Sequence, residues 1–340
     1  MLSFKFTSKK IWREIDRSHK ILLHLHPGPD GDSVGSALAF YHVLKNIGKD
    51  VSLIQGDNSL PTNLSTLPGA DKILPQNIFQ VDLTQFDLFI ILDSSSPRQV
   101  TRLGEFKFPK NLKTIVIDHH SSNEKFGKIN LVVPHSPATA QVLFDFFAVR
   151  NIKITPKIAA CLYAGIYTDS GGFKYVGTTH KTLTIASQLA KIYPKFSQLI
   201  FDIENNDPPE RLKLISLLLA SIEVYYSDQV ALASLSYQDI KTHGLEAAVS
   251  ASYSDVANMI KSVIGWNIAL VFVEIQPQTV KVSFRTRDSQ TYDLSKIALA
   301  TKSGGGHRAA AGATINKSLP EAKTLVLQTI KKLYPKIDKI

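Results

Sequence analysis

The stretch Ile21-Leu22-Leu23-His24-Leu25-His26-Pro27-Gly28-Pro29-Asp30-Gly31-Asp32 joins an apolar run to a turn. The turn begins at His26 and carries the carboxylates of Asp30 and Asp32. The apolar run predicts a buried β-strand, and apolar positions recurring every three or four residues over 34–47 predict a helix after the turn. Two prolines and two glycines bend the chain sharply, so the polar side chains of the turn can converge on one point. Metal binding is one role for them. Capping of the following helix by the acids of this turn is another, and Asp32 or Ser33 could provide that cap.

Around this stretch, short apolar runs alternate with helical patterns up to about residue 190. The further expected elements are strands at 50–55, 86–92 and 112–117 and helices near 139–150, 156–167 and 179–192. Strands that alternate with helices predict an α/β fold with a doubly wound, mainly parallel sheet. In such sheets the carboxyl ends of the strands form the ligand-binding crevice. Polar residues that follow the strands are therefore expected to meet.

The pattern changes in the second half of the chain. Turn and helix-boundary signals occur at Tyr193-Pro194-Lys195 and at Asn205-Asn206-Asp207-Pro208-Pro209. Beyond them the expected elements are strands at 229–236, 268–275 and 280–286 and helices at 253–264, 294–301 and 320–333. A length of 340 residues also favours two domains. We expect a catalytic domain over 1–192, a helical linker over 193–227 and a second, smaller α/β domain over 228–340.

Three more groups of acids and histidines directly follow apolar runs in the first domain: Asp93, then Asp118-His119-His120, then Asp169. An unpaired charge at the edge of a buried sheet is costly, and a carboxylate shared by two metal ions would remove that cost at Asp93. Taken singly, Asp93 is better explained as a helix cap or turn former, and Asp169 as an ordinary acid at a helix C-terminus. A chance pair of loop histidines is the alternative for the third group.

These residue types suit a two-metal hydrolase. Adjacent histidines project to different sides, so one can bind metal while the other faces the substrate as donor or acid. Asp118 can orient an imidazole by a hydrogen bond. Asp169 follows a helix, where negative charge is unfavourable, and this supports a nearby cation. Carboxylates and imidazoles without thiolates suit Mn²⁺ or a similar ion, and two such ions suit phosphoester hydrolysis.

A glycine-rich segment, Ser303-Gly304-Gly305-Gly306-His307, lies in the second domain. Three glycines let backbone N–H groups approach an anion closely, and a helix or turn after this loop would add donors. His307 can hydrogen-bond a phosphate or a base. Arg285, near the end of an expected strand, can clamp a second phosphate. A glycine-rich loop alone remains weak evidence for binding.

Composition limits the classes of partner and compartment. The formal net charge of +10 favours an anionic partner such as nucleic acid or a nucleotide. Cys161 is the single cysteine, which excludes an intramolecular disulfide and fits a reducing compartment. Its apolar surroundings predict a buried small hydrophobe rather than a nucleophile. No window of about eighteen apolar residues suits a membrane span, so we expect a soluble, cytoplasmic protein without a membrane partner.

Together the motifs resemble those of the DHH/DHHA1 phosphoesterases. The matching segments, in chain order, are 26–36, Asp93, Asp118-His119-His120, Asp169 and Gly304-Gly305-Gly306-His307. The third looks like the motif that names the family, and the last resembles the GGGH signature of the DHHA1 domain. Five ordered motifs over roughly 20–315 make the resemblance specific. Within the family, the chain is most similar to the nanoRNases with pAp phosphatase activity, the bifunctional oligoribonucleases.

The resemblance implies two Mn²⁺ ions per active site, with Mg²⁺ or Co²⁺ as alternatives. One ion would be held by His26, Asp30 and Asp93. The other would be held by Asp32, Asp93, His119 and Asp169, so that Asp93 bridges the pair. His120 would contact the scissile phosphate and help to protonate the leaving oxygen, with Asp118 as its catalytic partner. The substrate-binding residues implied are Arg285, Gly305, Gly306 and His307.

The expected function is hydrolysis of short oligonucleotides to mononucleotides in the interdomain cleft, with pAp 3′-phosphatase activity as a second expectation. One alternative is a cyclic dinucleotide (c-di-AMP) or linear dinucleotide phosphodiesterase, because the active-site motifs are shared. An alternative of another class is a non-catalytic nucleotide- or RNA-binding module. That module predicts lost metal ligands, and all of them are present. The oligomeric state is open, with a homodimer as one option.

Overall fold

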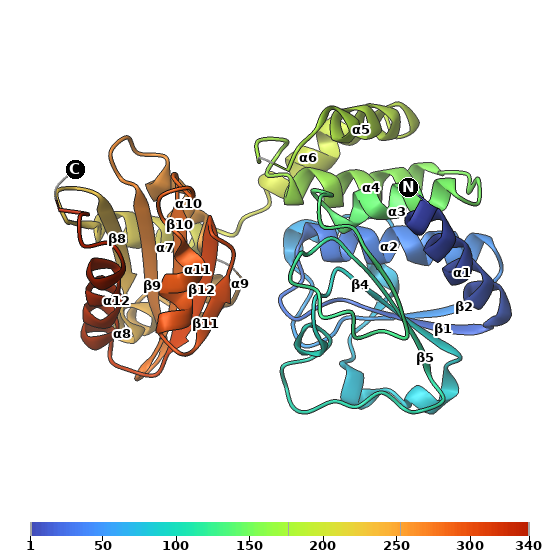
Figure 1. Ribbon diagram of the computed structural model, residues 1–340, viewed down its shortest axis with the longest axis horizontal. Helices are drawn as coiled ribbons and strands as arrows, with labels where there is room; N and C mark the ends of the chain where they lie inside the picture. Colours follow the sequence, from blue (N-terminus) through green and yellow to red (C-terminus); the bar gives the residue numbers. More distant parts are fainter. Residues whose placement is uncertain (1, 176, 252, 339–340) are drawn as a thin grey trace. The chain divides into compact units, whose positions relative to one another are not determined.

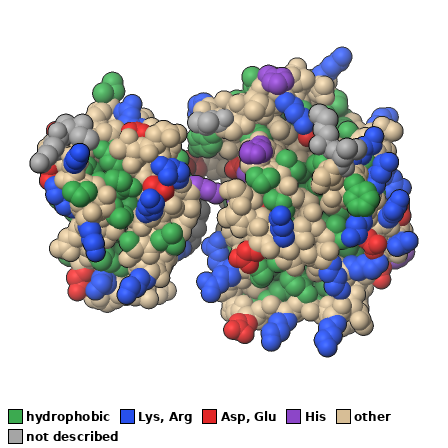
Figure 2. All heavy atoms as spheres, in the orientation of Figure 1, with side chains coloured by type: hydrophobic (Ala, Val, Ile, Leu, Met, Phe, Trp, Pro, Cys, Tyr) green, Lys and Arg blue, Asp and Glu red, His purple; other side chains and the backbone are tan. Residues whose placement is uncertain are grey.

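Two six-stranded sheets organise the computed structural model of the chain, which describes residues 2–175, 177–251 and 253–338. The chain divides into the units Met1–Asn206 and Asp207–Ile340, with one sheet in each (Figure 1). On the face seen in Figure 2, Lys and Arg side chains are scattered over the surface of the first unit rather than gathered in one patch. None of the helices in the described residues combines the length and apolar character that a membrane span requires.

The first sheet has the strand order β3-β2-β1-β4-β5-β6, and all neighbouring pairs are parallel. Its strands are β1 (Lys20–His24), β2 (Asp50–Ile54), β3 (Ile73–Leu74), β4 (Leu88–Leu92), β5 (Lys113–Asp118) and β6 (Ile129–Val132). This is a doubly wound order, in which the chain winds outward in both directions from the centre. The expected fold class is confirmed. The patterns do not predict β3 and β6, which are short edge strands.

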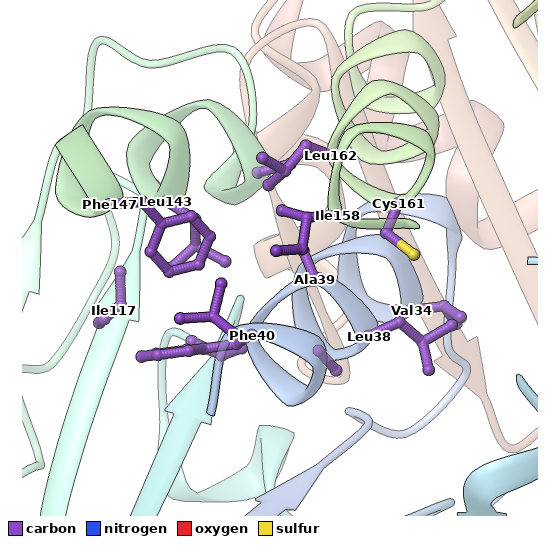
Figure 3. Close-up of a cluster of buried hydrophobic side chains, with 14 of the residues drawn as sticks. Val34, Leu38, Ala39, Phe40, Ile117, Leu143, Phe147, Ile158, Cys161 and Leu162 are labelled. Atoms are coloured by element: carbon purple, nitrogen blue, oxygen red, sulfur yellow. The ribbon is translucent and has the colours of Figure 1, made fainter. Parts of the chain in front are cut away.

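One face of this sheet is covered by helices. They are α1 (Leu2–Arg17), α2 (Gly31–Asn46), α3 (Thr139–Ala148) and α4 (Pro156–Asp169), with α5 (His180–Ile192) and α6 (Phe196–Glu204) packed against α4. Figure 3 shows Phe40 of α2, Phe147 of α3 and Ile158 of α4 gathered near Ile117 of β5. The sequence patterns do not predict α1, which buries Ile11 in the same core.

The opposite face of the sheet carries a thinner cover. Leu22 of β1, Phe89 of β4 and Val116 of β5 alternate with the residues that face the helices, as the period of a strand requires. They pack under Ile78, Leu83, Val100, Leu112 and Phe126, whose segments contain short 3₁₀ helices rather than α-helices. All the long helices, including α2 and α4, which lie near the strand ends, therefore pack on one face of the sheet.

Glycines allow α2 and α4 to approach each other closely. A Cβ atom added at Gly35 would lie 2.4 Å from the carbonyl oxygen of Cys161. One added at Gly165 would lie 2.8 Å from Oδ1 of Asp32. The backbone of α4 is thus pressed against the base of the turn that carries the first two acids. Cys161 is fully buried there and burial raises the pKa of its thiol, as expected for a packing residue.

The second unit is a smaller α/β structure with a mixed sheet of order β11-β12-β10-β9-β8-β7. Its strands are β7 (Glu223–Tyr225), β8 (Val230–Leu235), β9 (Ile268–Gln276), β10 (Thr279–Thr286), β11 (Gly304–Gly306) and β12 (Ala310–Ile315). The helices α7 (Pro209–Ala220), α8 (Tyr237–Thr242), α9 (Glu246–Ala251) and α10 (Ser254–Lys261) lie against one face. The other face carries α11 (Leu294–Ala300) and α12 (Leu319–Leu333).

The glycine-rich segment differs from its expected form. Instead of a loop, Gly304–Gly306 forms the edge strand β11, antiparallel to β12, and the expected turn follows it. The turn between them closes with the N–H of His307 donating to the carbonyl oxygen of Ala310, at 2.8 Å. The small residues of β12 accept the approach of a glycine backbone, so pairing replaces the loop.

Candidate metal centre

The four groups of acids and histidines converge at the carboxyl ends of β1, β4 and β5 and at the C-terminal end of α4. Three sets of candidate ligands have donor atoms within 4.8 Å of one another: His26, Asp30 and Asp93; Asp32, His119 and Asp169; and Asp93, Asp118, His119 and His120. Asp93 belongs to the first and third sets, and His119 belongs to the second and third. The three sets therefore form one cluster, which contains every metal-ligating residue expected from the sequence.

Asp93 lies at the centre of this cluster. Its Oδ2 is 3.5 Å from Nε2 of His26, and its Oδ1 is 3.6 Å from Nε2 of His119. The residue follows β4 in a left-handed conformation with φ of 52°, and its N–H donates to the carbonyl oxygen of Ile117 at 3.0 Å. That conformation costs an L-residue roughly 1–2 kcal/mol. The backbone is strained where it presents one buried carboxylate to two histidines.

The two histidines that face Asp93 are held in the same way. Nδ1 of His26 lies 3.3 Å from the carbonyl oxygen of Pro27, and Nδ1 of His119 lies 3.0 Å from that of Ser136. A carbonyl oxygen only accepts, so each Nδ1 carries the proton. The unshared electron pair is then on Nε2, which faces the carboxylates. A main-chain carbonyl that fixes the tautomer in this way is typical of metal-binding histidines.

Asp30 both caps a helix and belongs to the candidate ligand cluster. Oδ1 of Asp30 accepts from the N–H groups of Asp32 and Ser33, at 3.1 and 2.9 Å, so Asp30 is the N-cap of α2. The expected alternative, a polar turn whose acids cap this helix, is confirmed for Asp30, whereas Asp32 and Ser33 do not provide the cap. Asp30 has the extended backbone of an N-cap, whereas Asp32 is already inside the helix. Its carboxylate can therefore turn to another partner.

Asp32 caps a helix far away in the sequence. Its Oδ2 accepts from the N–H of Thr139 at 2.6 Å, and its Oδ1 accepts from the N–H of Ala140 at 2.9 Å and from Oγ of Ser36 at 3.1 Å. These amides begin α3, whose own N-cap residue, Ala138, has no side-chain acceptor. The positive end of the α3 dipole thus stabilises a fully buried carboxylate. Helix capping and metal binding are not alternatives for this residue.

Thr139 joins the two parts of the cluster, and the sequence patterns do not single it out. Its Oγ1 donates to Oδ1 of Asp93 at 3.0 Å, while its N–H donates to Asp32. It is itself fully buried. The only local signal is its place at the start of a predicted helix that has no N-cap side chain. That signal does not predict that Asp32, more than one hundred residues earlier, accepts the hydrogen bond.

Crowding raises the pKa values of two of the carboxylates, those of Asp32 and Asp169. Burial and the charges of Asp93 and Asp169 hold the pKa of Asp32 well above its ordinary value. Burial, together with the charges of Asp93 and Asp30, raises the pKa of Asp169 to about 7, although His119 opposes the rise. Several negative groups share a small volume from which water is largely excluded. The cluster therefore carries more negative charge than its own residues balance.

The same negative charges also raise the pKa values of the histidines. Burial lowers the pKa of His26, but Asp30 and Asp93 outweigh that effect and hold it well above its ordinary value. His119 is likewise raised above its ordinary pKa, with Asp93 and Asp32 outweighing burial. The cluster binds protons tightly because positive charge is favourable inside it. Divalent cations offer the same compensation.

The donor set fits divalent metal ions. Nitrogen–oxygen separations of 3.2 Å between His119 and Asp169 and of 3.5 Å between His26 and Asp93 are close to the spacing of adjacent ligands on one ion. That spacing is about 3 Å for octahedral coordination with metal–oxygen distances near 2.1 Å. Oxygen and imidazole donors without sulfur are ligands that divalent cations accept, and they do not by themselves select one metal.

His120 is held differently from its neighbour. Its Nδ1 lies 2.7 Å from Oδ1 of Asp118, a fully buried carboxylate. Burial lowers the pKa of His120, but the hydrogen bond to Asp118 and the charge of Asp93 raise it to about 9. The rings of His119 and His120 meet at 60° with centroids 4.4 Å apart. One histidine faces the carboxylate cluster through Nε2, and the other is committed to Asp118 through Nδ1.

The expected substrate-binding residues lie at one end of the sheet in the second unit. Arg285 on β10 pairs with Ala310 on β12, and Gly306 on β11 pairs with Ala311, so these residues lie at nearly the same level. The Arg285 side chain is partly buried, and Nη1 donates to the carbonyl oxygen of Phe284 at 2.9 Å. Gly305 and His307 continue the exposed edge.

The three glycines of β11 differ in whether neighbouring atoms leave room for a side chain. A Cβ atom added at Gly304 would lie 2.7 Å from the carbonyl oxygen of Ala298, and one at Gly306 would lie 2.6 Å from Cα of Ala311. Gly306 also has φ of 138°, which favours glycine. A Cβ atom at Gly305 would meet no atom of the described residues within 4 Å. Packing within the unit therefore does not account for a glycine at 305.

Comparisons with known proteins agree with this geometry. The chain matches the family model of the DHH family, N-terminal domain, over residues 20–166 and that of the DHHA1 domain over residues 240–334. It is 29% identical over 313 residues to the bifunctional oligoribonuclease and PAP phosphatase NrnA of Thermus thermophilus, covering 92% of this chain and 89% of that protein. The protein with the same description in Bacillus subtilis is 24% identical over 306 residues, covering 89% and 91%.

A solved structure shares the fold over nearly the whole chain. An exopolyphosphatase-related protein from Bacteroides fragilis superposes with a TM-score of 0.87 at 24% sequence identity, covering 97% of each chain. Because the sequence identity is low, this likeness concerns the fold alone.

Proposed function

This chain belongs to the DHH family of phosphoesterases, hydrolases of phosphodiester or phosphate bonds, and we propose that it is a Mn²⁺-dependent exonuclease for very short oligoribonucleotides. We further propose that it removes the 3′-phosphate of pAp. Two relatives described as bifunctional oligoribonucleases and PAP phosphatases support both activities, because the similarity covers about nine-tenths of this chain.

The observation that carries the proposal is the position of the Asp93 carboxylate between two histidines. Each oxygen faces a different Nε2, at 3.5 Å for His26 and 3.6 Å for His119. A carboxylate whose two oxygens face two separate ligand sets is suited to bridge two ions. We assign His26, Asp30 and Asp93 to one ion and Asp32, Asp93, His119 and Asp169 to the other.

Divalent cations at these positions would supply Lewis acidity, which acidifies water and offsets the charge that grows on phosphate. The chain itself supplies the rest. Asp118 holds Nδ1 of His120, so His120 would meet the scissile phosphate through its other ring nitrogen and pass a proton to the leaving oxygen. The hydrogen bond to Asp118 raises the pKa of His120 and so favours the protonated imidazole that a general acid requires.

We assign substrate recognition to the second unit. Arg285 would pair with a phosphate, and the backbone of Gly305 and Gly306 would approach the terminal nucleotide, with His307 donating to it. The open space at Gly305 supports this role, because a glycine that packing does not require is suited to close approach by a ligand.

Purified protein stripped of metal and reloaded with Mn²⁺ would be assayed in parallel on pApA, pAp, c-di-AMP and a long single-stranded RNA. We expect hydrolysis of pApA and pAp, with mononucleotides as products and little cleavage of the long RNA. Mg²⁺ and Co²⁺ replace Mn²⁺ in parallel reactions to identify the preferred ion.

Two outcomes would overturn the proposal. Equal cleavage at internal positions of the long RNA would exclude an enzyme for short ends. Hydrolysis of c-di-AMP with pApA left intact would indicate a cyclic dinucleotide phosphodiesterase instead. An Asp93→Asn preparation serves as the blank for contaminating nucleases, because it removes the shared ligand while keeping a side chain of the same shape.

A further inference from the structure

Asn123 lies in the turn after the histidine pair, and its side chain connects the ends of two strands. Its Nδ2 donates to Oδ2 of Asp118 at 2.6 Å and to the carbonyl oxygen of Ser94 at 3.0 Å. Asp118 ends β5, and Ser94 follows Asp93 after β4. One amide group therefore ties together the two strand ends that carry the bridging carboxylate and the histidine pair.

The orientation of this amide is determined by its surroundings. Oδ1 of Asn123 accepts from the N–H of Lys125 at 2.6 Å, so the oxygen faces the turn and the nitrogen faces the carboxylate. The reverse orientation would set the amide oxygen against two acceptors, Asp118 and Ser94. A buried network in which every group has a partner keeps one arrangement.

Both carboxylate oxygens of Asp118 therefore have hydrogen-bond partners. Oδ1 faces Nδ1 of His120 at 2.7 Å, and Oδ2 accepts from Asn123 at 2.6 Å. The carboxylate is fully buried, and rotating it would break both bonds. Its plane, and with it the direction in which the imidazole of His120 points, depends on the donor at 123.

We infer that Asn123 is a positioning residue, which holds the Asp118 carboxylate and, through it, the imidazole of His120 in the orientation used at the scissile phosphate. The inference rests on the proposed function, since it assigns Asn123 to the proton-transfer side of the site rather than to metal binding. Residues that orient a catalytic or ligating group typically contribute about 10–100-fold.

The test uses three variants in the full-length, Mn²⁺-loaded protein. Asn123→Ala removes all the side-chain bonds, whereas Asn123→Asp keeps an acceptor for Lys125 but replaces the donor to Asp118 with a second negative charge. Asn130→Ala is the matched control, because Asn130 also bridges a turn through its amide, donating to the carbonyl oxygen of Gly127 and accepting from its N–H.

For both Asn123 variants we expect kcat on pApA to fall about 10–100-fold, with KM and the number of bound Mn²⁺ ions unchanged. The loss should shrink on a p-nitrophenyl phosphodiester, whose leaving group departs without a proton. Asn130→Ala should keep the wild-type kcat even if its melting temperature falls. If Asn123 only shapes the turn, N123D should recover the wild-type rate, and that recovery would overturn the inference.

A second readout does not depend on activity. In metal-stripped or Mg²⁺-loaded protein labelled with ¹⁵N-histidine, the Nδ1–H of His120 bonded to a carboxylate should give a strongly shifted, slowly exchanging signal. We expect N123A to shift or lose this signal and N130A to retain it. An unchanged N123A spectrum would overturn the inference. A wild-type protein that hydrolyses none of the substrates would instead overturn the proposed function, which this spectrum does not test.

Discussion

The metal centre of the first unit and the glycine strand of the second both present polar groups, but the two are held in opposite ways. In the centre, Asp32 and Asp118 are buried, and each has both carboxylate oxygens engaged by the protein. On β11, Gly305 is exposed and borders open space. A charged cluster must be fixed by the fold because its members repel one another, whereas a backbone that receives a ligand must be left accessible.

The contrast predicts that substitutions in the centre act on metal and turnover, with the largest effect at Asp93. Asp93→Asn should lower hydrolysis of pApA about a thousand-fold or more, because several kcal/mol of transition-state stabilisation depend on the ions. Asparagine tolerates the left-handed backbone at this position, so the fold should persist. Steady-state kinetics, Mn²⁺ titration and circular dichroism on the same preparation measure the three consequences.

The control for this substitution is the acid at the other end of the same strand. Asp87 directly precedes β4, and its Oδ2 accepts from the N–H groups of His19 and Lys20 at 2.8 Å each. Asp87→Asn should leave turnover near the wild-type value. Equal losses for the two variants would mean that β4 needs its charges for folding and that the two ends of the strand do not differ in function.

The next largest effect is expected at Thr139, which holds the centre without belonging to the ligand set. Thr139→Val removes the donor to Asp93 but keeps the main-chain N–H that caps Asp32. Mn²⁺ affinity should fall about ten-fold, the lower end for a residue that orients a ligand. Calorimetric titration of the metal-stripped protein measures this, with Thr139→Ser as the variant that retains the hydroxyl. Identical Mn²⁺ affinities of the Thr139→Val and Thr139→Ser variants would contradict the role of the hydroxyl.

On the glycine strand, neighbouring positions should separate binding from stability. Gly305→Ala should keep the wild-type melting temperature and raise KM for pApA, because an added methyl group obstructs a ligand but no part of the described protein. Gly304→Ala should lower the free energy of unfolding by about 1–3 kcal/mol through overpacking against Ala298 and Ala313. A wild-type KM for G305A would show that no ligand approaches this backbone.

The smallest effect concerns pH and the metal-stripped protein. The pKa of Asp169 is raised to about 7 and that of His120 to about 9, so both groups hold protons more tightly when the chain is folded. Their contributions to stability are complete below the unfolded values and are lost as pH rises through the folded ones. We therefore expect the melting temperature of the stripped protein to fall between pH 6 and pH 9.

Adding Mn²⁺ should reverse this trend, because the ions replace protons and bind more tightly as pH rises. Differential scanning fluorimetry at several pH values, with and without chelator, tests both halves of the expectation. Asp169→Asn should flatten the lower part of the pH profile of the stripped protein. A stripped protein that becomes more stable toward pH 9 would contradict the repulsion inferred for the cluster.

Local patterns predict most of the first sheet and the polar groups at its edge. The strands β1, β2, β4 and β5 and the helices α2, α3, α4 and α5 are visible in the sequence because their apolar periods and turn residues depend on near neighbours. The short edge strands and the pairing of Gly304–Gly306 with β12 are not, since a strand of two to four residues is defined by its partner.

For residues 21–32, the sequence alone determined a strand, a sharp turn and two acids whose negative charges need hydrogen-bond donors or cations. Only the tertiary structure decided which groups bind each acid. Asp30 caps its own helix, while Asp32 caps α3 through amides that lie more than one hundred residues further along the chain. Thr139 and Asn123 enter the site for the same reason. Parallel strand order brings distant strand ends together, and the hydrogen bonds across them depend on that order rather than on any local pattern.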